Sequence, residues 1–477
     1  MRLPEPVRRY LLGLLERDAA ERAMEDAELQ ALAAAAEGRS VRPLPELLRG
    51  WVSSATAQMR WKRARPVAAK ELSDHLADQY EAFLDEGMDE EAAAQATARE
   101  MGDAVETGTR LDRAWRPRPD WVMLGIVLVV AAMGLTLQYL LRPHNDLEWY
   151  MFFGKYVAGA VCLLAAYFVD YTILGRHCWL LYGLWVAGGL LLAFGPIRGE
   201  SMGKLVYLAQ WVWFFPVLFA GILFRQRGKG TRGIGICLLS LPVMWFLAIH
   251  APSMAAIAVL TVVSCGMLFM AVWRGAFGRR GKGKLLLAVL PLLFAAVYVG
   301  FLLLFDAGVR EAFAIAFDPS IDPQGEGYWG ELVRQMMFGS PEGQGHGLMF
   351  MQWNDATTDW LFMTTKWTWG WPGAAFLIGA EVLLLVWGFR IAYRQIGLLA
   401  RSVCMGVMAT FALQTFLYVL QNCGIILIDS YGLPLLSYGG MYLCQTMLLL
   451  GLLLSAQRSG QLESGTVPLP ARPVLRR

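Results

Sequence analysis

The chain has 477 residues, of which 56% are hydrophobic and only 17% are charged, and its mean hydropathy is +0.43. This composition excludes a string of ordinary soluble domains, whose charged fraction is about a quarter. The formal net charge of +3 gives no reason to expect a nucleic-acid partner. The seven cysteines form no CxxC pair and lie in or beside apolar segments, so neither a zinc site nor a disulfide framework is expected.

Charged residues gather at the start of the chain, and we expect residues 1–116 to form a cytoplasmic helical prefix domain. The N-terminus has too short an apolar run for a signal peptide and soon becomes acidic, so no removable leader is expected. Residues 1–60 are rich in alanine, leucine and charged side chains, which favours helices there as well.

Residues 66–112 predict two consecutive helices. In the first, apolar side chains recur every three or four positions, at Leu72, Leu76, Tyr80 and Phe83. Gly87 is expected to end this helix, and Asp89 to cap a second one that presents Ala92, Ala96 and Met101. Through its HL, EGM, EEA and MGD pairs and triplets, this stretch resembles the HAAS, or permease-prefix, domain found ahead of some bacterial membrane proteins. The resemblance implies an interaction or regulatory module for an unidentified cytoplasmic partner.

Ten apolar runs follow, each of about 20 residues and long enough to cross a bilayer as a helix. They begin near Trp121, Trp149, Cys178, Tyr207, Gly233, Pro252, Leu285, Trp371, Ser402 and Met441. The expected fold class is all-α: a polytopic membrane protein with about ten transmembrane helices over residues 117–460, preceded by a small soluble helical domain. Residues 461–477 are expected to form a disordered cytoplasmic tail.

The connections between these runs differ in charge. Residues 225–233, 274–284 and 390–401 are strongly basic and fall on one side under a ten-span count, which predicts that this side, with both chain termini, is cytoplasmic. One long, acid-rich connection, residues 306–359, falls on the opposite side. A connection of this length is usually functional, so we expect the chemistry of the chain to face outward.

Three motifs occur in order on that outer side. The long connection opens with Arg310, Phe317, Asp318-Pro319, Asp322-Pro323, Gly327 and Tyr328. It closes with Thr358-Asp359-Trp360-Leu361-Phe362 and the glycines Gly370 and Gly373. The last hairpin carries Gln414, Gly424, Leu433-Pro434 and Ser437-Tyr438-Gly439-Gly440. At these spacings the motifs resemble the SEDS family, the FtsW/RodA/SpoVE group of bacterial cell-wall polymerases, over most of residues 120–457.

The resemblance implies a peptidoglycan glycosyltransferase that polymerises lipid II, an undecaprenyl-pyrophosphate-linked disaccharide-pentapeptide, in division, shape maintenance or sporulation. It also implies a location in the bacterial plasma membrane and a class B penicillin-binding protein as partner. The essential carboxylate of the family corresponds to Asp359. A divalent cation, Mg²⁺ or Mn²⁺, is an option for assisting departure of the pyrophosphate, with its ligands unidentified. The substrate-binding candidates are Arg310, Gln414, Ser437, Tyr438, Gly439, Gly440, Lys204 and Glu381.

The chain departs from the family's pattern beside these positions. Thr357 stands where the family has a histidine, Trp367-Thr368 where it has two glutamates, and Tyr418 where it has an asparagine. Lys204 is taken as the stand-in for a lysine of an early-span motif. These departures keep two alternatives open: a catalytically divergent scaffold or regulator of wall-synthesis enzymes and, ranked last, a transporter of lipid-linked substrates.

Two carboxylates have competing interpretations. Asp359 is either the catalytic group or a cap for the eighth span, since Asp is favoured before helices. Glu381 lies within that span, where an unpaired charge is costly. It is either a neutral, hydrogen-bonded side chain or a replacement for a missing family carboxylate.

The segment GLPLLSYGG, residues 432–440, is flexible and polar between the last two spans. Irregular backbone at membrane depth is tolerated only where it is buried in protein or lines a cavity. Because this segment falls on the same side as Asp359, we expect Ser437 to Gly440 to form one wall of the outward site and to shape it more than to perform chemistry.

Overall fold

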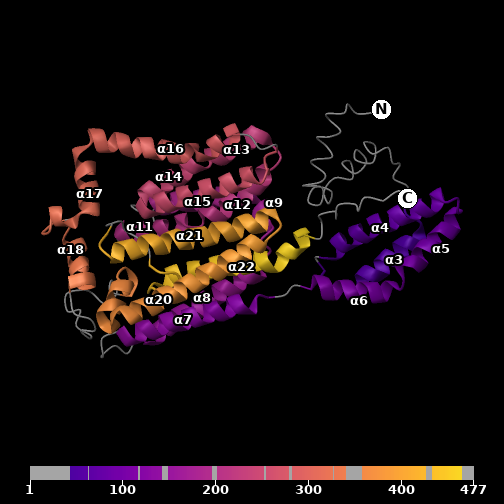
Figure 1. Cartoon of the computed structure of the whole chain (residues 1–477), viewed down its shortest axis with the longest axis horizontal. Coiled ribbons are helices and arrows are strands. Elements are labelled where there is room, and N and C mark those ends of the chain that lie inside the picture. The colour runs from indigo at the N-terminus through magenta and orange to yellow at the C-terminus, as the bar shows by residue number, and fades with distance from the viewer. Residues whose placement is uncertain are drawn as a thin grey trace. The chain divides into compact units, whose positions relative to one another are not determined.

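In the computed structural model, the described residues are 43–464 except 63, 117–118, 142–148, 196–200, 252–253, 279–281, 326, 340–356 and 426–431. Among these residues the regular structure is helical (Figure 1). The chain divides into two compact units, one of Met1–Pro119 with Arg458–Arg477 and one of Asp120–Gln457. The expected helices within residues 1–42 lie outside the described part.

The N-terminal unit packs four helices around a small apolar core. They are α3 (Glu46–Ala57), α4 (Arg65–Asp85), α5 (Glu90–Met101) and α6 (Ala104–Trp115). The core contains Leu48, Val52, Ala55, Leu72, Leu76, Tyr80, Ala93 and Ala94. A fully buried leucine such as Leu76 contributes about 1.5–3 kcal/mol through removal of apolar surface from water.

The helix ends of this unit lie where glycine and aspartate predict them. Gly87 follows α4 with a φ of 92°, and Gly102 follows α5 with a φ of 75°. The face of α5 differs in part from the expected one: Met101 packs against the core, but Ala92 is exposed, and the buried residues are Ala93, Ala94 and Thr97. With alanine on several sides of this helix, packing against α3 and α4 selects the buried face, and the spacing of the alanines alone does not.

The membrane unit is a bundle of long apolar helices joined by short ones. In chain order they are α7 (Trp121–Leu141), α8 (Trp149–Phe168), α9 (Ile173–Arg176), α10 (Cys178–Phe194), α11 (Ser201–Val212), α12 (Phe215–Gln226), α13 (Gly230–Leu239), α14 (Leu241–His250), α15 (Met254–Trp273), α16 (Lys282–Phe305), α20 (Leu361–Arg394), α21 (Leu398–Asn422) and α22 (Gly440–Ser464). Proline in the first turn of α12 and of α14 accompanies the breaks that precede these helices.

Within the described residues, eight helical stretches are long and apolar enough to cross a membrane. Two shorter apolar helices, Phe153–Phe168 and Cys178–Phe194, occupy the positions of the second and third expected spans. The all-α, multi-pass membrane fold predicted from the sequence is therefore confirmed. Helix α22 extends to Ser464, into the tail that was expected to be disordered from residue 461.

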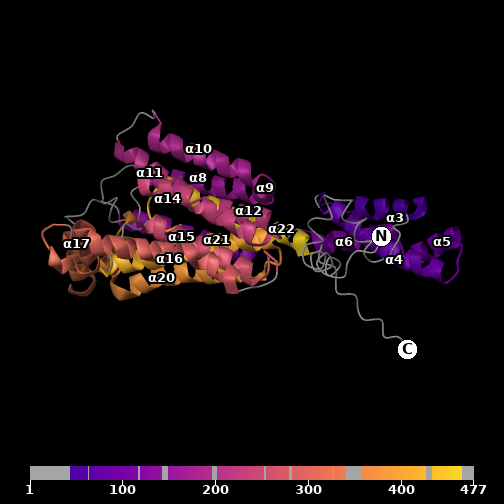
Figure 2. The same ribbon diagram turned by 90° about the horizontal axis from the view of Figure 1, so that it is seen from above.

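The long outer connection contains helices of its own. They are α17 (Ala307–Phe317), the 3₁₀ turn η1 (Pro319–Ile321), α18 (Tyr328–Arg334) and the π-helical turn η2 (Gln335–Gly339). Figures 1 and 2 show α17 at the opposite end of the membrane unit from α9. The structured part of the connection thus covers one end of the bundle.

The eighth span begins earlier than its hydropathy suggests. It was expected near Trp371, but α20 starts at Leu361 and is interrupted by a kink at Gly370, whose φ is 71° and ψ is −171°. The residues before the kink are apolar and threonine-rich, and Leu361 to Lys366 are all buried. Gly370 and Pro372 together separate this buried N-terminal segment from the membrane-spanning remainder.

Candidate functional site

The GLPLLSYGG segment lies inside the membrane unit rather than on its surface. Residues 432–437 are buried, and Leu433, Leu435 and Leu436 are fully so. Leu435 adopts a φ of 64°, which non-glycine residues rarely take. Such conformations persist where the surroundings hold the backbone tightly, and they cluster at functional sites.

Side chains from four helices satisfy the carbonyl groups of this segment. Gln138 of α7 donates to Leu436 O at 3.0 Å, and Tyr156 of α8 donates to Leu435 O at 3.1 Å. The carbonyl oxygen of Gly432 accepts two hydrogen bonds, one from the Gln414 amide of α21 at 3.0 Å and one from the Tyr442 hydroxyl of α22. The irregular backbone is thus hydrogen-bonded by protein at membrane depth, as the sequence argument required.

The same segment is bonded to the residues that carry the expected catalytic aspartate. Tyr438 N donates to Thr357 O at 2.9 Å, and the hydroxyl of Ser437 donates to Thr358 O at 3.0 Å. Ser437 Oγ also accepts from Leu433 N at 2.8 Å, which closes the turn on itself. Two of the three sequence motifs are therefore in direct contact.

Helix α21 fixes the backbone on both sides of Asp359. The Tyr418 hydroxyl donates to Thr358 O at 2.9 Å and accepts from Leu361 N at 2.8 Å. One turn further, the Asn422 amide donates to Asp359 O at 2.9 Å and accepts from Met363 N at 3.1 Å. These two buried side chains clamp the start of α20 between them.

Asp359 itself is half-buried and precedes α20 by two residues. The N-cap position of α20 is Trp360, whose own side chain makes no cap hydrogen bond. The amides of Leu361 and Met363 in the first turn donate to Tyr418 and Asn422 instead, so Asp359 does not hold the N-cap position that the alternative interpretation gave it. The backbone directly before it is bonded to the segment that contains Ser437 and Tyr438.

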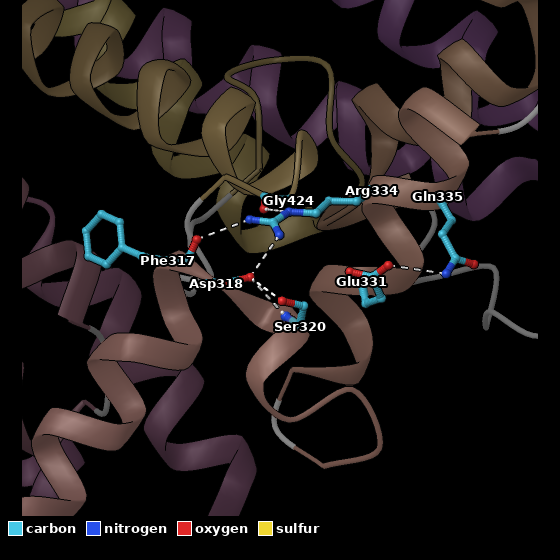
Figure 3. Close-up of polar contacts among 7 residues, drawn as sticks. All are labelled: Phe317, Asp318, Ser320, Glu331, Arg334, Gln335 and Gly424. Carbon is cyan, nitrogen blue, oxygen red and sulfur yellow. Dashed lines mark hydrogen bonds and ion pairs between the residues drawn. The ribbon is translucent and has the colours of Figure 1, made fainter.

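The outer connection is attached to the end of α21 by an arginine (Figure 3). Arg334 donates to Gly424 O at 2.7 Å, to Phe317 O at 3.1 Å and to Asp318 Oδ1 at 3.4 Å. Hydrogen bonds from Ser320, with a smaller effect from the Arg334 guanidinium, hold the pKa of the Asp318 carboxyl below its usual value. All three sequence motifs thus join through α21.

The remaining substrate-binding candidates, Arg310, Lys204, Gly439 and Gly440, lie in different parts of the membrane unit. Arg310 is an exposed residue of α17, and the arginine that the structure brings to the motif junction is Arg334. Lys204 lies in α11 among residues whose side chains are not described. Gly439, with a φ of 144°, and Gly440 lie at the entry to α22.

Glu381 lies fully buried in α20 and accepts from Thr415 Oγ1 at 3.3 Å. Thr415 is the sequence neighbour of Gln414, so Glu381 belongs to the bundle interior behind the segment. Its second carboxyl oxygen has no hydrogen-bond partner among the described residues. This contact accords with the interpretation as a neutral, hydrogen-bonded side chain, the form that is least costly there.

Spacing alone missed several contributors to the site: Gln138, Lys155, Tyr156, Arg334, Asn422 and Tyr442. Most of them hold backbone groups rather than belonging to a recognisable motif. A signal existed for Asn422, which lies one helical turn after Tyr418, the position where the family has an asparagine. Polar residues within the apolar runs of the first two spans were the signal for Gln138 and Lys155.

Within the part of the chain that the structure describes, the site places Asp359, a half-buried residue, next to hydroxyl and backbone groups. Across the described ranges, no group of three or more His, Cys, Asp or Glu residues could hold a metal ion. A divalent cation would find Asp359 as the protein ligand and would need substrate phosphates and water for the rest. The aspartate suits the site to proton transfer by a carboxylate.

Comparison with known proteins gives consistent matches. Residues 120–462 match the model of the cell cycle protein family FtsW/RodA/SpoVE. The "Probable peptidoglycan glycosyltransferase FtsW" of Thiomicrospira cyclica is 30% identical over 382 residues, covering 74% of this chain and 93% of that protein. The protein with the same name in Idiomarina loihiensis is 26% identical and covers 69% of this chain and 76% of its own length. A chain from a peptidoglycan synthase complex has the same fold, with a TM-score of 0.55, 19% identity and coverage of 72% of this chain and 98% of its own.

Proposed function

We propose, since the chain belongs to the FtsW/RodA/SpoVE family of cell cycle proteins, that it is a peptidoglycan glycosyltransferase that polymerises lipid II at the outer face of the bacterial plasma membrane. The basic connections at residues 225–233, 274–284 and 390–401 support cytoplasmic termini and an outward site. The family and the names of the relatives support the activity.

One observation carries the proposal: helix α21 and the segment 432–440 together hold the backbone around Asp359. Chain elongation joins a sugar 4-hydroxyl to the anomeric carbon of a second lipid-linked sugar. The new C–O bond forms as the bond from that carbon to the pyrophosphate breaks, and undecaprenyl pyrophosphate leaves. We assign Asp359 as the general base that accepts the hydroxyl proton, a role that contributes about 10² to 10⁴ in rate.

We also propose that the chain works with a class B penicillin-binding protein, which would crosslink the strands. The prefix unit would then serve as a cytoplasmic interaction or regulatory module. Its described core is a helical packing of leucine, valine, alanine and tyrosine.

A non-catalytic scaffold for wall-synthesis enzymes is the second candidate. Thr357 and Trp367-Thr368 replace the histidine and the two glutamates of the family's motif. Thr357 is fully buried and its carbonyl is used to hold Tyr438, so this position supports the architecture of the site. A scaffold would keep that architecture without turnover.

The two candidates are separated by incubating the full-length protein in proteoliposomes with fluorescent lipid II and resolving glycan chains on a gel. The assay is run with and without a co-encoded class B penicillin-binding protein whose transpeptidase is blocked. We expect polymer from the wild type and from Glu311→Ala, which removes an exposed carboxylate of the same connection, and none from Asp359→Ala. Absence of polymer from the wild type with its partner, despite a stable complex, would establish the scaffold instead.

A further inference from the structure

A lysine of the second span reaches the SYGG residues from outside the three motifs. The ammonium of Lys155, in α8, is hydrogen-bonded to the Tyr438 hydroxyl and lies 3.8 Å from the centre of its ring. Tyr438 N is bonded to Thr357 O, two residues from Asp359. The Lys155 ammonium therefore contacts the side chain of Tyr438, and the backbone of Tyr438 is bonded to the segment that contains Asp359.

The side chain of this lysine points toward protein, although it lies near the end of an apolar helix. Lys155 is six residues beyond Trp149, at which α8 begins, so it lies about 9 Å along the helix at 1.5 Å per residue. Lysines near helix ends ordinarily extend toward the interface and keep the ammonium in water. Lys155 is half-buried and directs its ammonium onto Tyr438. Ionisable groups held at such positions mark substrate and ion sites.

Gly440, the first residue of α22, leaves room for the Lys155 side chain. A Cβ at Gly440 would lie 3.1 Å from Lys155 Cγ, 3.3 Å from Cδ and 3.5 Å from Cε, so the lysine stem runs along the bare backbone of this residue. Helix α22 begins there, and the first amide groups of a helix point their N–H bonds outward with a partial positive charge. The ammonium thus adds to a favourable field for an anion.

We infer that Lys155 is the residue that binds the pyrophosphate of the lipid-linked substrate and of the undecaprenyl pyrophosphate that leaves. This inference rests on the proposed function. An ammonium has three N–H donors, so Tyr438 can orient it while it donates to a phosphate oxygen. As the bond from the anomeric carbon to the pyrophosphate breaks, negative charge grows on that oxygen, and a fixed cation stabilises it.

The test measures binding of undecaprenyl pyrophosphate to the full-length protein in phosphatidylcholine nanodiscs, together with KM and kcat for lipid II. A hydrogen bond to a charged group contributes about 1.5–3 kcal/mol, so Lys155→Gln should raise the Kd for undecaprenyl pyrophosphate by roughly ten- to hundredfold. Lys155→Arg should stay within about threefold of the wild type, because it keeps the charge. Lys284→Gln is the matched control: this half-buried lysine donates to Phe277 O at 2.9 Å beside a basic connection.

Three outcomes would overturn the inference. One is a wild-type Kd for Lys155→Gln in a protein whose melting temperature shows that it is folded. Another is equal weakening by Lys155→Arg and Lys155→Gln, which would indicate a packing role. The third is full displacement of undecaprenyl pyrophosphate by phosphatidylglycerol, which would assign the lysine to phospholipid headgroups.

The binding measurement requires no turnover, so its failure and that of the proposed function are distinguishable. A protein that binds undecaprenyl pyrophosphate through Lys155 but forms no polymer would refute the polymerase and support the lysine assignment. A protein that polymerises lipid II with an unchanged KM after Lys155→Gln would support the polymerase and refute the lysine assignment.

Discussion

Asp359 is positioned by neutral residues. Tyr418 and Asn422, on successive turns of α21, bind backbone groups from Thr358 to Met363, among them the carbonyl of Asp359 itself. The sequence motif predicts which aspartate is functional, because the residues that identify it, Thr358 to Phe362, are consecutive in the chain. It does not predict the clamp, because a tyrosine or asparagine in an apolar run does not reveal which distant carbonyl it will meet.

Tyr418→Phe tests the clamp at the residue scale. The change leaves the buried Leu361 N without its partner, whereas Thr358 O keeps the Ser437 hydroxyl, so the free energy of unfolding should fall by about 1–3 kcal/mol. Lipid II polymerisation should fall as well, because the backbone beside Asp359 is released. Tyr393→Phe, at a tyrosine 59% exposed near the end of α20, should change neither quantity. Wild-type stability and rate for Tyr418→Phe would show that the clamp is dispensable.

At the scale of elements, α20 shows where hydropathy fails as a guide. The apolar run predicts a span from Trp371, but the helix begins ten residues earlier with a segment that is buried against α21 and η2. Lys366 lies in this segment, 1% exposed, and donates to Met336 O at 3.0 Å. The threonines and the lysine of residues 361–370 gave no indication of a helix in the sequence. Contacts with α21 and η2 make this segment a buried helix.

Gly370→Ala tests the kink that separates the two parts of α20. A φ of 71° with a ψ of −171° is a conformation essentially restricted to glycine, and it costs a residue with a Cβ about 1–3 kcal/mol, so we expect lower thermal stability and slower polymerisation. Gly379→Ala is the matched control in the same helix, since its Cβ would meet nothing within 4 Å and helix interiors favour alanine over glycine. A Gly370→Ala protein as stable and active as Gly379→Ala would mean that α20 tolerates a straight helix.

At the scale of the whole molecule, charge and hydropathy separate a soluble prefix from a membrane body near residue 116, and the contacts of the structure divide at Pro119. Composition does not predict the buried polar interactions that stabilise the prefix unit. Asp112 is 5% exposed and accepts from Arg60 N at 2.8 Å and from the Arg116 guanidinium at 2.8 Å. These bonds, with Arg116 contributing most, lower the pKa of the Asp112 carboxyl.

Asp112→Ala should loosen the prefix unit and leave the membrane unit unaffected. Because the folded pKa lies below the unfolded one, the carboxylate stabilises the unit above the unfolded pKa, about 3.9, and this stabilisation is lost as the pH falls through the folded pKa. Hydrogen exchange of residues 104–115 should therefore be faster in the variant at pH 7, and the difference should disappear in strong acid. The polymerisation rate should be unchanged. A slower rate with unaltered exchange would contradict this independence.

The central claim is that Asp359 takes a proton during glycan elongation, and the most direct measurement is the single-turnover rate of Asp359→Asn at saturating lipid II. Asparagine keeps the shape of the side chain and removes its basicity. We predict a loss of about 10² to 10⁴ in rate, with the affinity for undecaprenyl pyrophosphate within about threefold of the wild type, because the lysine assigned to the pyrophosphate is retained. A single-turnover rate for Asp359→Asn equal to that of the wild type would contradict the account.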